Sequence, residues 1–515
     1  MVKPIGSLCN LNCDYCYYID KKFADVKGVM SDELLENYIR QIVEIHGQKA
    51  VIEFAWHGGE PTIAGIPFYK KALQYQNKYA SGRKLLNTLQ TNGTLLDDEW
   101  CSFFKDNDFR IGISIDGPEN LHNIYRKDSS GNGTFNRVMN GLELLQKHNV
   151  EYNTLTTVNA SNAQYAREVY SFLRSISDYM QFLPVVESVG AEGNIALPPG
   201  IDSVEVNFPM ASFNVQAEDY GRFLCDVFDY WLNVDVGKKF VQIFEATIGN
   251  LTNRHAGLCV HEAVCGHCAV VERDGNVYRC DRYVFDEYKI GNIKDNSLEL
   301  MMESNRDFGQ YKLESLPSRC LHCDVVELCF GGCPKDRLLD QMTINGTERR
   351  NYLCAADRMF FRLFKNNYKI IFMTSVFYKI MCIFVTYKSS KSIYENIYEI
   401  CWKNSRLVFL CQIFVAASCN RNTDPENDEQ QQLPIALLNY RVNIAESVLD
   451  LTDVSIVFED NAGNVETEII TSDMMQEDFM DLLLYIKEYR FDDFPASFNC
   501  RVSCTPKIDI DPYEF

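Results

Sequence analysis

Short apolar runs alternate with amphipathic stretches along the first 245 residues of the chain. The apolar runs predict strands that end in polar or glycine-rich turns, at 51–58, 84–94, 110–117 and 150–159. The amphipathic stretches predict helices at 67–80, 97–106 and 134–148. This alternation is typical of parallel strands joined by crossover helices, as in a barrel or an open α/β sheet. In such folds the reacting groups gather at the carboxyl ends of the strands, where GGEP, QTNG and SIDGP lie, so we expect one shared site.

The next segment, residues 246–365, is rich in cysteine and glycine and has few long periodic stretches. Its sequence ERDGNVYRC at 272–280 predicts a hairpin that turns at Asp274 and Gly275. A segment with so many loops needs more than a large apolar core, and metal ligation can supply the missing free energy. We therefore expect a barrel domain at 1–245 and a metal-stabilised domain at 246–365.

The C-terminal third has a different character. Residues 370–387 are apolar and barely long enough to span a bilayer, but they contain Lys379. Residues 403–419 resemble a bacterial lipoprotein signal that ends at Cys419, in the middle of a chain where it should not work. Residues 366–432 are therefore expected to be a linker created by a frameshift or a fusion, or a genuine fusion with a buried apolar helix. Residues 433–515 predict a small β-rich domain with a hairpin turn at 460–463.

Composition narrows the functional classes. The formal net charge of −21 argues against non-specific binding to nucleic acid or to an anionic membrane. The 20 cysteines stand in uneven groups within a chain of 515 residues, unlike the short chains of secreted disulfide scaffolds. No secretory signal opens the sequence, so we expect reduced, metal-binding thiols in the cytoplasm.

The first cysteine group is CNLNCDYC, which places Cys9, Cys13 and Cys16 at the spacing C-x3-C-x2-C. Three thiolates can hold three irons of a four-iron cluster and leave the fourth iron open to a small molecule. A structural zinc knuckle is the alternative, but it needs a fourth ligand close by. The nearest candidate, His46, lies thirty residues downstream of Cys16.

The second motif, HGGEPT at 57–62, follows a predicted strand. Two glycines let the backbone approach a ligand closely, and Glu60 could then receive an ammonium group. Gly-Gly turns are common, so the motif gains weight only from its place on the same predicted edge as the cysteine loop.

CNLNCDYC, GGEP and SIDG together resemble the radical S-adenosylmethionine (SAM) enzymes. The resemblance implies that SAM binds the open iron through its amino and carboxylate groups. It further implies that Gly58, Gly59 and Glu60 hold the methionyl amine, that Tyr15 lies by the adenine, and that Ser114 contacts the carboxylate or ribose. One electron then splits the sulfonium into methionine and a 5′-deoxyadenosyl radical, chemistry that belongs to the cofactor.

A larger cysteine group follows, with eight thiols at Cys259, Cys265, Cys280, Cys320, Cys323, Cys329, Cys333 and Cys354. Eight thiols can ligate two four-iron clusters fully. A zinc ribbon could use Cys320, Cys323, Cys329 and Cys333, but it would leave the other four thiols unexplained. The arrangement resembles the SPASM extension of radical enzymes that modify peptides and proteins.

Residues 1 to about 360 resemble the anaerobic sulfatase-maturating enzymes, through WHGGEPT, LQTNGTLLDDEW, GISIDGP, HNIYRKD, VYRCDRYV and NYLC. The resemblance implies that Cys259, Cys265, Cys280 and Cys333 hold one auxiliary cluster, and that Cys320, Cys323, Cys329 and Cys354 hold the other. Relatives usually carry Cys-x-Cys-Gln where this chain has Gly266, His267 and Cys268, so Cys268 is an extra thiol.

Asp281, directly after Cys280, matches the acidic residue that this family uses as a general base. A carboxylate beside a cluster in a closed pocket can have a raised pKa and accept the proton of a thiol or hydroxyl. The alternative is a solvated aspartate in a turn.

Together these patterns predict an α/β fold, a partial (β/α)6 radical SAM barrel followed by a loop-rich iron–sulfur SPASM domain, with an unrelated C-terminal β-rich segment. The expected reaction is oxidation of a Cys or Ser side chain in an unfolded sulfatase, or its CxPxR or SxPxR peptide, to Cα-formylglycine. The expected cofactors are SAM and three [4Fe–4S] clusters, with flavodoxin or ferredoxin as electron donor and no nucleic acid partner. Two alternatives remain: a SPASM maturase of a ribosomal peptide, and a non-catalytic zinc-stabilised binding protein.

Overall fold

The computed structural model describes most of the N-terminal part of the chain and six strands of its C-terminal part. The described residues are 1–18, 28–47, 51–80, 82–190, 193, 195, 209–252, 256–339, 349–368 and the strands β13 to β18. The chain divides into two compact units, Met1–Ile383 and Phe384–Phe515. The apolar segments predicted at 370–387 and 403–419 lie outside the described residues. Among the helices that are described, none is both long and apolar enough to cross a membrane.

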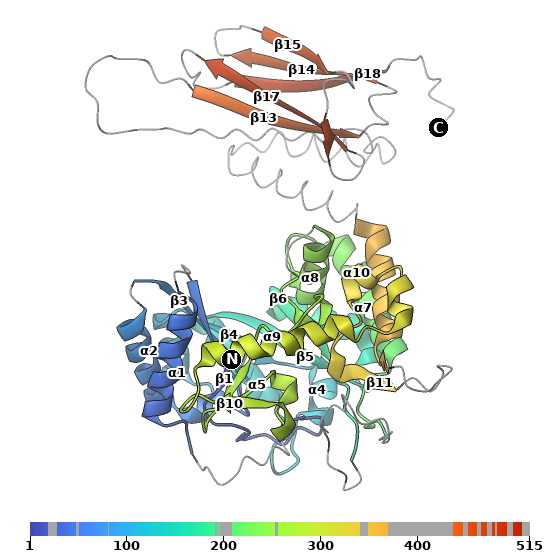
Figure 1. Ribbon diagram of the computed structural model, residues 1–515. Helices are drawn as coiled ribbons and strands as arrows, with labels where there is room; N and C mark the ends of the chain where they lie inside the picture. The colour runs from blue at the N-terminus through green and yellow to red at the C-terminus, as the bar shows by residue number, and fades with distance from the viewer. Residues whose placement is uncertain are drawn as a thin grey trace, which may run out of the picture. The chain divides into compact units, whose positions relative to one another are not determined.

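The first unit is built on one ten-stranded sheet with the order β10-β9-β8-β1-β2-β3-β4-β5-β6-β7 (Figure 1). Strands β1 to β7 are parallel neighbours in chain order, which confirms the partial (β/α)6 barrel. These strands are β1 (Val2–Lys3), β2 (Val51–Trp56), β3 (Lys84–Thr91), β4 (Phe109–Ser114), β5 (Glu151–Val158), β6 (Tyr179–Pro184) and β7 (Phe240–Val241).

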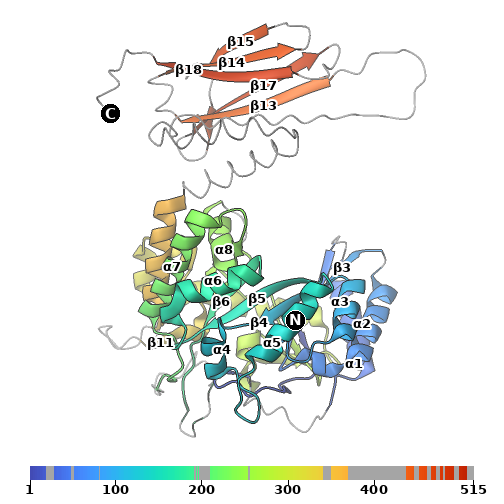
Figure 2. The ribbon, with the colours of Figure 1, turned by 180° about the vertical axis from the view of Figure 1, so that it is seen from behind.

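Helices alternate with these strands, and the three helices predicted from the sequence are all present. In both views α1 and α2 lie at one end of the sheet, with α7 and α8 at the other (Figures 1 and 2). The helices are α1 (Asp32–Ile45), α2 (Ile66–Tyr79), α3 (Asp98–Asp106), α4 (Glu119–Tyr125), α5 (Phe135–Lys147), α6 (Ala166–Ile176), α7 (Ala217–Val234), α8 (Gln242–Leu251), α9 (Leu298–Glu314) and α10 (Val326–Cys329).

The predicted hairpin at 272–280 is confirmed as β8 (Val270–Glu272) and β9 (Asn276–Tyr278), followed by β10 (Lys289–Asn292). Its turn contains Gly275, whose φ of 88° favours glycine. The hairpin continues the barrel sheet, because β8 pairs in parallel with β1, Val2 with Val271 and Lys3 with Glu272. The cysteine-rich segment is thus joined to the barrel through the sheet itself.

A closing helix at 354–368 packs against α7 and α8 through aromatic side chains. The ring centroids of Phe228 and Phe364 are 4.8 Å apart, and those of Phe244 and Phe360 are 5.5 Å apart. Just before this helix, the short strands β11 (Arg337–Leu339) and β12 (Arg349–Asn351) form a separate antiparallel pair. Buried aromatic packing of this kind fixes the second end of the cysteine-rich segment on the barrel.

The second unit contains two three-stranded antiparallel sheets, with the orders β13-β17-β16 and β15-β14-β18. The β-rich character predicted for the C-terminal segment is therefore confirmed, although the turn predicted at 460–463 falls largely outside the described residues. The strands are β13 (Ala436–Ala445), β14 (Thr452–Asp460), β15 (Val465–Ile470), β16 (Gln476–Asp478), β17 (Leu482–Phe491) and β18 (Phe498–Pro506).

Candidate functional site

In the loop that follows β1, the pKa of Cys9 is influenced by Cys13, and the pKa of Cys13 is influenced by Cys16. Burial, with a smaller contribution from the neighbouring thiol, raises the pKa of Cys9 and of Cys13 to about 11. The Cys9 sulfur accepts the backbone N–H of Leu11 at 3.3 Å and lies 3.7 Å from the side-chain amide of Asn92. Amide donors aimed at sulfur stabilise a thiolate, the form that ligates iron. Cys9, Cys13 and Cys16 therefore fit the predicted ligand set.

The GGEP turn supports this loop by direct backbone contact. The N–H of Gly59 donates to the carbonyl of Gly6 at 2.8 Å, and that of Glu60 donates to Leu8 at 2.9 Å. A Cβ atom on Gly59 would lie 2.1 Å from the Leu8 carbonyl oxygen. The close approach that this glycine permits is thus an approach to the cysteine loop.

Glu60 joins two of the predicted motifs. It caps η1 (Pro61–Ala64), with Oε1 accepting the backbone N–H of Thr62 at 3.1 Å and the hydroxyls of Thr62 and Thr91 at 2.7 Å each. Its Oε2 accepts the N–H of Asn92 at 2.7 Å, so the carboxylate ties GGEP to QTNG. Burial raises the pKa of Glu60, and these hydrogen bonds oppose that rise. The amine-holding role of Glu60, with Gly58 and Gly59, stays a prediction.

The other two predicted SAM contacts have polar partners. The hydroxyl of Tyr15 donates to Asp116, and Ser114, the last residue of β4, accepts from the Gln90 amide at 3.1 Å. Neither contact tests the predicted roles, Tyr15 beside the adenine and Ser114 at the carboxylate or ribose of SAM, so both roles stay predictions.

A buried ion pair beside the first cluster motif was not singled out in the sequence. Arg126 Nε lies 3.0 Å from Asp116 Oδ2, and both side chains are buried. Burial raises the pKa of Cys13, and Arg126 is the next largest influence and lowers it. Both residues stand in motifs quoted above: Asp116 in SIDGP, just after β4, and Arg126 in HNIYRKD, just after α4. Charged residues within these motifs were therefore the available signal.

The eight thiols of the cysteine-rich segment fall into two electrostatic groups. The first group comprises Cys259, Cys265, Cys280 and Cys333. Burial raises the pKa of Cys259, Cys265 and Cys280, and the nearby Cys333 raises it further. In the described residues, no three His, Cys, Asp or Glu side chains are close enough to share one metal ion. The second group comprises Cys320, Cys323, Cys329 and Cys354. Burial is the largest cause that raises the pKa of Cys320, Cys329 and Cys354. Smaller contributions come from Cys354 at Cys320 and Cys329, and from Cys323 at Cys354.

These groups match the two ligand sets implied by the family resemblance. The extra thiol of Cys268 is exposed and makes a minor contribution to the pKa of Cys259, so it borders the first group. Four thiols are the number that a fully ligated four-iron cluster needs, so each group has the right composition for one cluster.

Asp281 directly follows Cys280 of the first auxiliary thiol group and contacts Lys3 on the barrel strand β1. Its carboxylate forms an ion pair with Lys3 and accepts the hydroxyl of Tyr17. Burial alone would raise the pKa of Asp281, but Lys3, His57 and the Tyr17 hydroxyl together bring it well below its usual range. The expectation of a raised pKa is therefore wrong, because β1 places an ammonium group against this carboxylate.

Tyr17 links Asp281 to both cysteine motifs. After burial and Asp281, the charges of Cys16 and Cys280 are the next influences that raise the pKa of Tyr17. His57 also borders Asp281, and its Nδ1 accepts the N–H of Gly58 at 2.9 Å, so the neutral ring carries its proton on Nε2. The first cluster motif, the GGEP turn and the auxiliary thiols therefore converge around one carboxylate.

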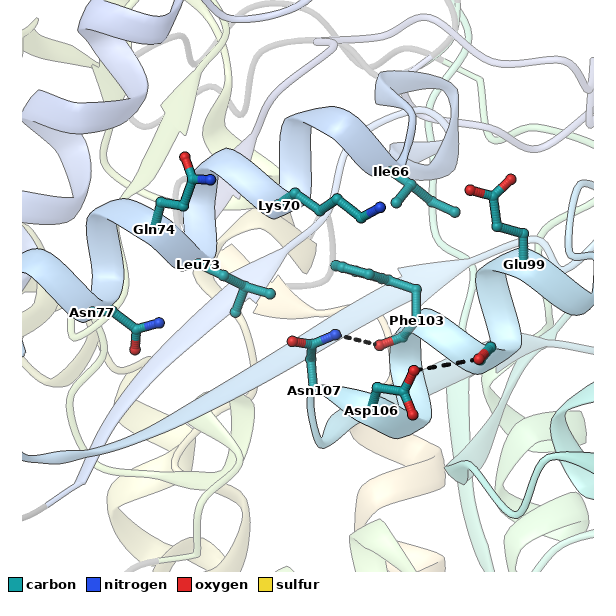
Figure 3. A pocket seen from close by; sticks show the side chains of 10 residues that line it. Ile66, Lys70, Leu73, Gln74, Asn77, Glu99, Phe103, Asp106 and Asn107 are labelled. Atoms are coloured by element: carbon teal, nitrogen blue, oxygen red, sulfur yellow. Dashed lines mark hydrogen bonds between the residues drawn. The ribbon is translucent and has the colours of Figure 1, made fainter.

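A separate hollow of about 450 Å³ lies between α2 and α3, on the outer helices of the barrel (Figure 3). Lys70 and Glu99 line it, with Leu73 and Phe103 supplying apolar surface. None of the predicted site residues is among its lining residues.

Family models match the two parts of this site. The model described as the radical SAM superfamily matches residues 4–173, and the SPASM model, an iron–sulfur cluster-binding domain, matches residues 259–324.

Several known proteins are similar over most of the first unit. The serine-type anaerobic sulfatase-maturating enzyme of Bacteroides thetaiotaomicron is 44% identical over 372 residues, which cover 70% of this chain and 88% of the relative. The cysteine-type enzyme of Clostridium perfringens is 32% identical over 370 residues, covering 70% and 94%. The solved structure "Native anSMEcpe with bound AdoMet" matches with a TM-score of 0.62 and 30% identity, covering 73% of this chain and 98% of that one. A second solved structure, "Native anSMEcpe with bound AdoMet and Cp18Cys peptide", matches with the same TM-score of 0.62 and 30% identity.

Proposed function

Because the chain belongs to the anaerobic sulfatase-maturating enzymes of the radical SAM superfamily, we propose that it oxidises a Cys or Ser side chain of a sulfatase to Cα-formylglycine. The observation that carries this proposal is the position of Asp281. Its carboxylate accepts a hydrogen bond from Tyr17, which follows Cys16 of the first cluster motif. Asp281 also directly follows Cys280, one of the auxiliary thiols. A target side chain at Asp281 would thus lie between the source of the radical and an electron acceptor.

The chain supplies ligands for each cofactor. Cys9, Cys13 and Cys16 would hold the SAM-binding [4Fe–4S] cluster, with Tyr15, Ser114 and the GGEP turn around SAM. The two auxiliary clusters would be held by the two thiol groups described above. When bound, SAM and these clusters supply the radical that removes the target's Cβ hydrogen atom and the acceptor for the second electron.

Asp281 provides the proton-accepting group. Its low pKa keeps the carboxylate ionised at neutral pH, and 24% of its side chain remains accessible to a target. It takes the proton of the target's hydroxyl or thiol, whose acidity rises once the Cβ hydrogen atom has gone. A Ser target then gives the aldehyde directly, and a Cys target gives a thioaldehyde that water hydrolyses with release of sulfide.

The experiment compares wild-type protein with Asp281→Asn under anaerobic conditions after cluster reconstitution. Each is incubated with SAM, a reductant and a CxPxR or SxPxR peptide, and the products are weighed by mass spectrometry. Peptides with Ala at the target position are the control. We expect aldehyde from the wild type, and from Asp281→Asn we expect 5′-deoxyadenosine with at least a hundredfold less aldehyde.

Two results would contradict the proposal. SAM cleavage by the wild type without aldehyde, but with a crosslinked or epimerised peptide, would favour a peptide maturase. Aldehyde formation at the wild-type rate by Asp281→Asn would remove the base assignment.

The remaining partners belong to the same proposal. Reductive cleavage of SAM consumes one electron, so we propose a low-potential donor protein such as flavodoxin or ferredoxin. Clusters held by reduced thiols suit the cytoplasm, where we propose that the enzyme works. The net charge of −21 supports the absence of a nucleic acid partner.

A further inference from the structure

Lys3 is a lysine with no exposed surface, on the short strand β1. Its partner across the parallel pair β1–β8 is Glu272, which is also fully buried. Side chains at paired positions of neighbouring strands point to the same face of a sheet, so ammonium and carboxylate share one side. The charge of Lys3 lowers the pKa of Glu272, which burial raises to about 7.

The ammonium group of Lys3 is fixed from several directions. Its Nζ lies 3.6 Å from the centroid of the Tyr18 ring, within the range of a cation–π contact. The Tyr18 hydroxyl donates to Glu272, so the ring under the ammonium is itself anchored. Lys3 therefore has little freedom to move, and a group bound to it is held equally firmly.

That group is the Asp281 carboxylate. Lys3 pairs with Oδ1, an atom that is buried from solvent, while Tyr17 donates to Oδ2. Because 24% of the Asp281 side chain is accessible and Oδ1 is enclosed, only the Oδ2 edge of the carboxylate is left to meet a target.

We propose that Lys3 is a positioning residue, which binds Oδ1 of Asp281 and so turns Oδ2 toward the target side chain. The inference rests on the proposed function, and it adds a residue 278 positions away from the base that it orients. Removal of one partner of a buried ion pair leaves the other charge uncompensated, which is destabilising whatever the role of the pair. Product formation is therefore compared with iron content and SAM cleavage, which report whether the fold is intact.

The test uses the full-length protein with reconstituted clusters. Lys3→Met and Lys3→Gln remove the charge, Lys3→Arg keeps it, and Lys78→Met is the matched control, because Lys78 forms an exposed ion pair with Glu36. Formylglycine peptide and 5′-deoxyadenosine are measured in the same reactions, together with iron content and the KM for the peptide. Crystal structures of wild type and Lys3→Met report the orientation of Asp281 independently of activity.

We expect both neutral variants to keep their iron and their deoxyadenosine formation, with formylglycine per deoxyadenosine lowered about tenfold or more and KM little changed. Lys3→Arg should recover most of this ratio, and Lys78→Met should match the wild type. The Asp281 carboxylate should be rotated in Lys3→Met.

Either of two results overturns the inference. One is a wild-type product ratio in the neutral variants, or an unmoved carboxylate in Lys3→Met. The other is loss of iron or of SAM cleavage in proportion to product, which would make Lys3 purely structural. Failure of the proposed function is separate, because it would appear in the wild type as deoxyadenosine without aldehyde.

Discussion

The contact between Gly59 and the cysteine loop can be broken with one methyl group. In Gly59→Ala the new Cβ would lie 2.1 Å from the Leu8 carbonyl oxygen and 2.5 Å from its carbon. Ordinary contacts of a carbon atom are near 3.5 Å, so the backbone must separate by about 1 Å or more. The atoms in conflict are main-chain atoms, and no side-chain rotation can relieve them.

The energetic cost can be worked from the bonds that hold the two segments together. Separation weakens two backbone hydrogen bonds, from Gly59 to Gly6 and from Glu60 to Leu8. Each contributes about 1 kcal/mol net, and overpacking of a tight contact costs about 1–3 kcal/mol more. A total of about 3–5 kcal/mol lies at or below the stability of most domains, so the damage should be confined to the loop that carries Cys9.

The assay counts iron and measures SAM cleavage after anaerobic reconstitution. We expect about twelve irons per chain in the wild type and about eight in Gly59→Ala, because the two auxiliary thiol groups are untouched. Formation of 5′-deoxyadenosine should fall below about a tenth of the wild-type rate.

The control is Gly131→Ala, at a glycine with a φ of 81° and no atom within 4 Å of a new Cβ. This variant should cost about 1 kcal/mol through its backbone conformation alone and keep all of its iron. Full iron content and SAM cleavage in Gly59→Ala would refute the reasoning, because the loop would then tolerate the displacement.

Two further predictions concern the thiols and a buried acid. Cys333→Ala and Cys354→Ala should each lose about four irons, from different auxiliary clusters, and the double variant about eight; a loss of only four in the double variant would mean one shared cluster. Burial raises the pKa of Glu272 from 4.5 to about 7, so the folded chain binds this proton more tightly and loses stability as the pH rises through that range. Glu272→Gln should therefore gain about 2 kcal/mol relative to the wild type between pH 5.5 and 8, measured by denaturant unfolding; an equal difference at both pH values would contradict the assignment.

The sequence was a good guide to local elements and a poor one to pairings over long distances. The run at 110–117 predicts a strand, and β4 indeed covers Phe109–Ser114, because the polar turn that follows ends it. The hairpin at 272–280 was also predictable from its turn residues. Its pairing with β1 was not, because paired residues 269 positions apart leave no shared pattern in the chain.

The same limit applies to the site. The spacing of Cys9, Cys13 and Cys16 favours a cluster loop once the GGEP and SIDG motifs are added, whereas the division of the eight later thiols into two groups depends on tertiary contacts. The expectation of a raised pKa for Asp281 was wrong for the same reason, because Lys3 is distant in sequence and adjacent in space. The domain boundaries at 245 and 365 stay predictions.

The two-residue strand β1 has one paired position with β2 and two with β8. Most of its pairing thus comes from residues near 271, which leave the ribosome long after the loop at Cys9 to Cys16. The nascent chain must wait for them before the strand that anchors this loop is fixed on both sides. Iron loading of the first motif should accordingly follow the pairing of β8 with β1, and a truncated translation product that stops before residue 270 should be unable to retain the metal.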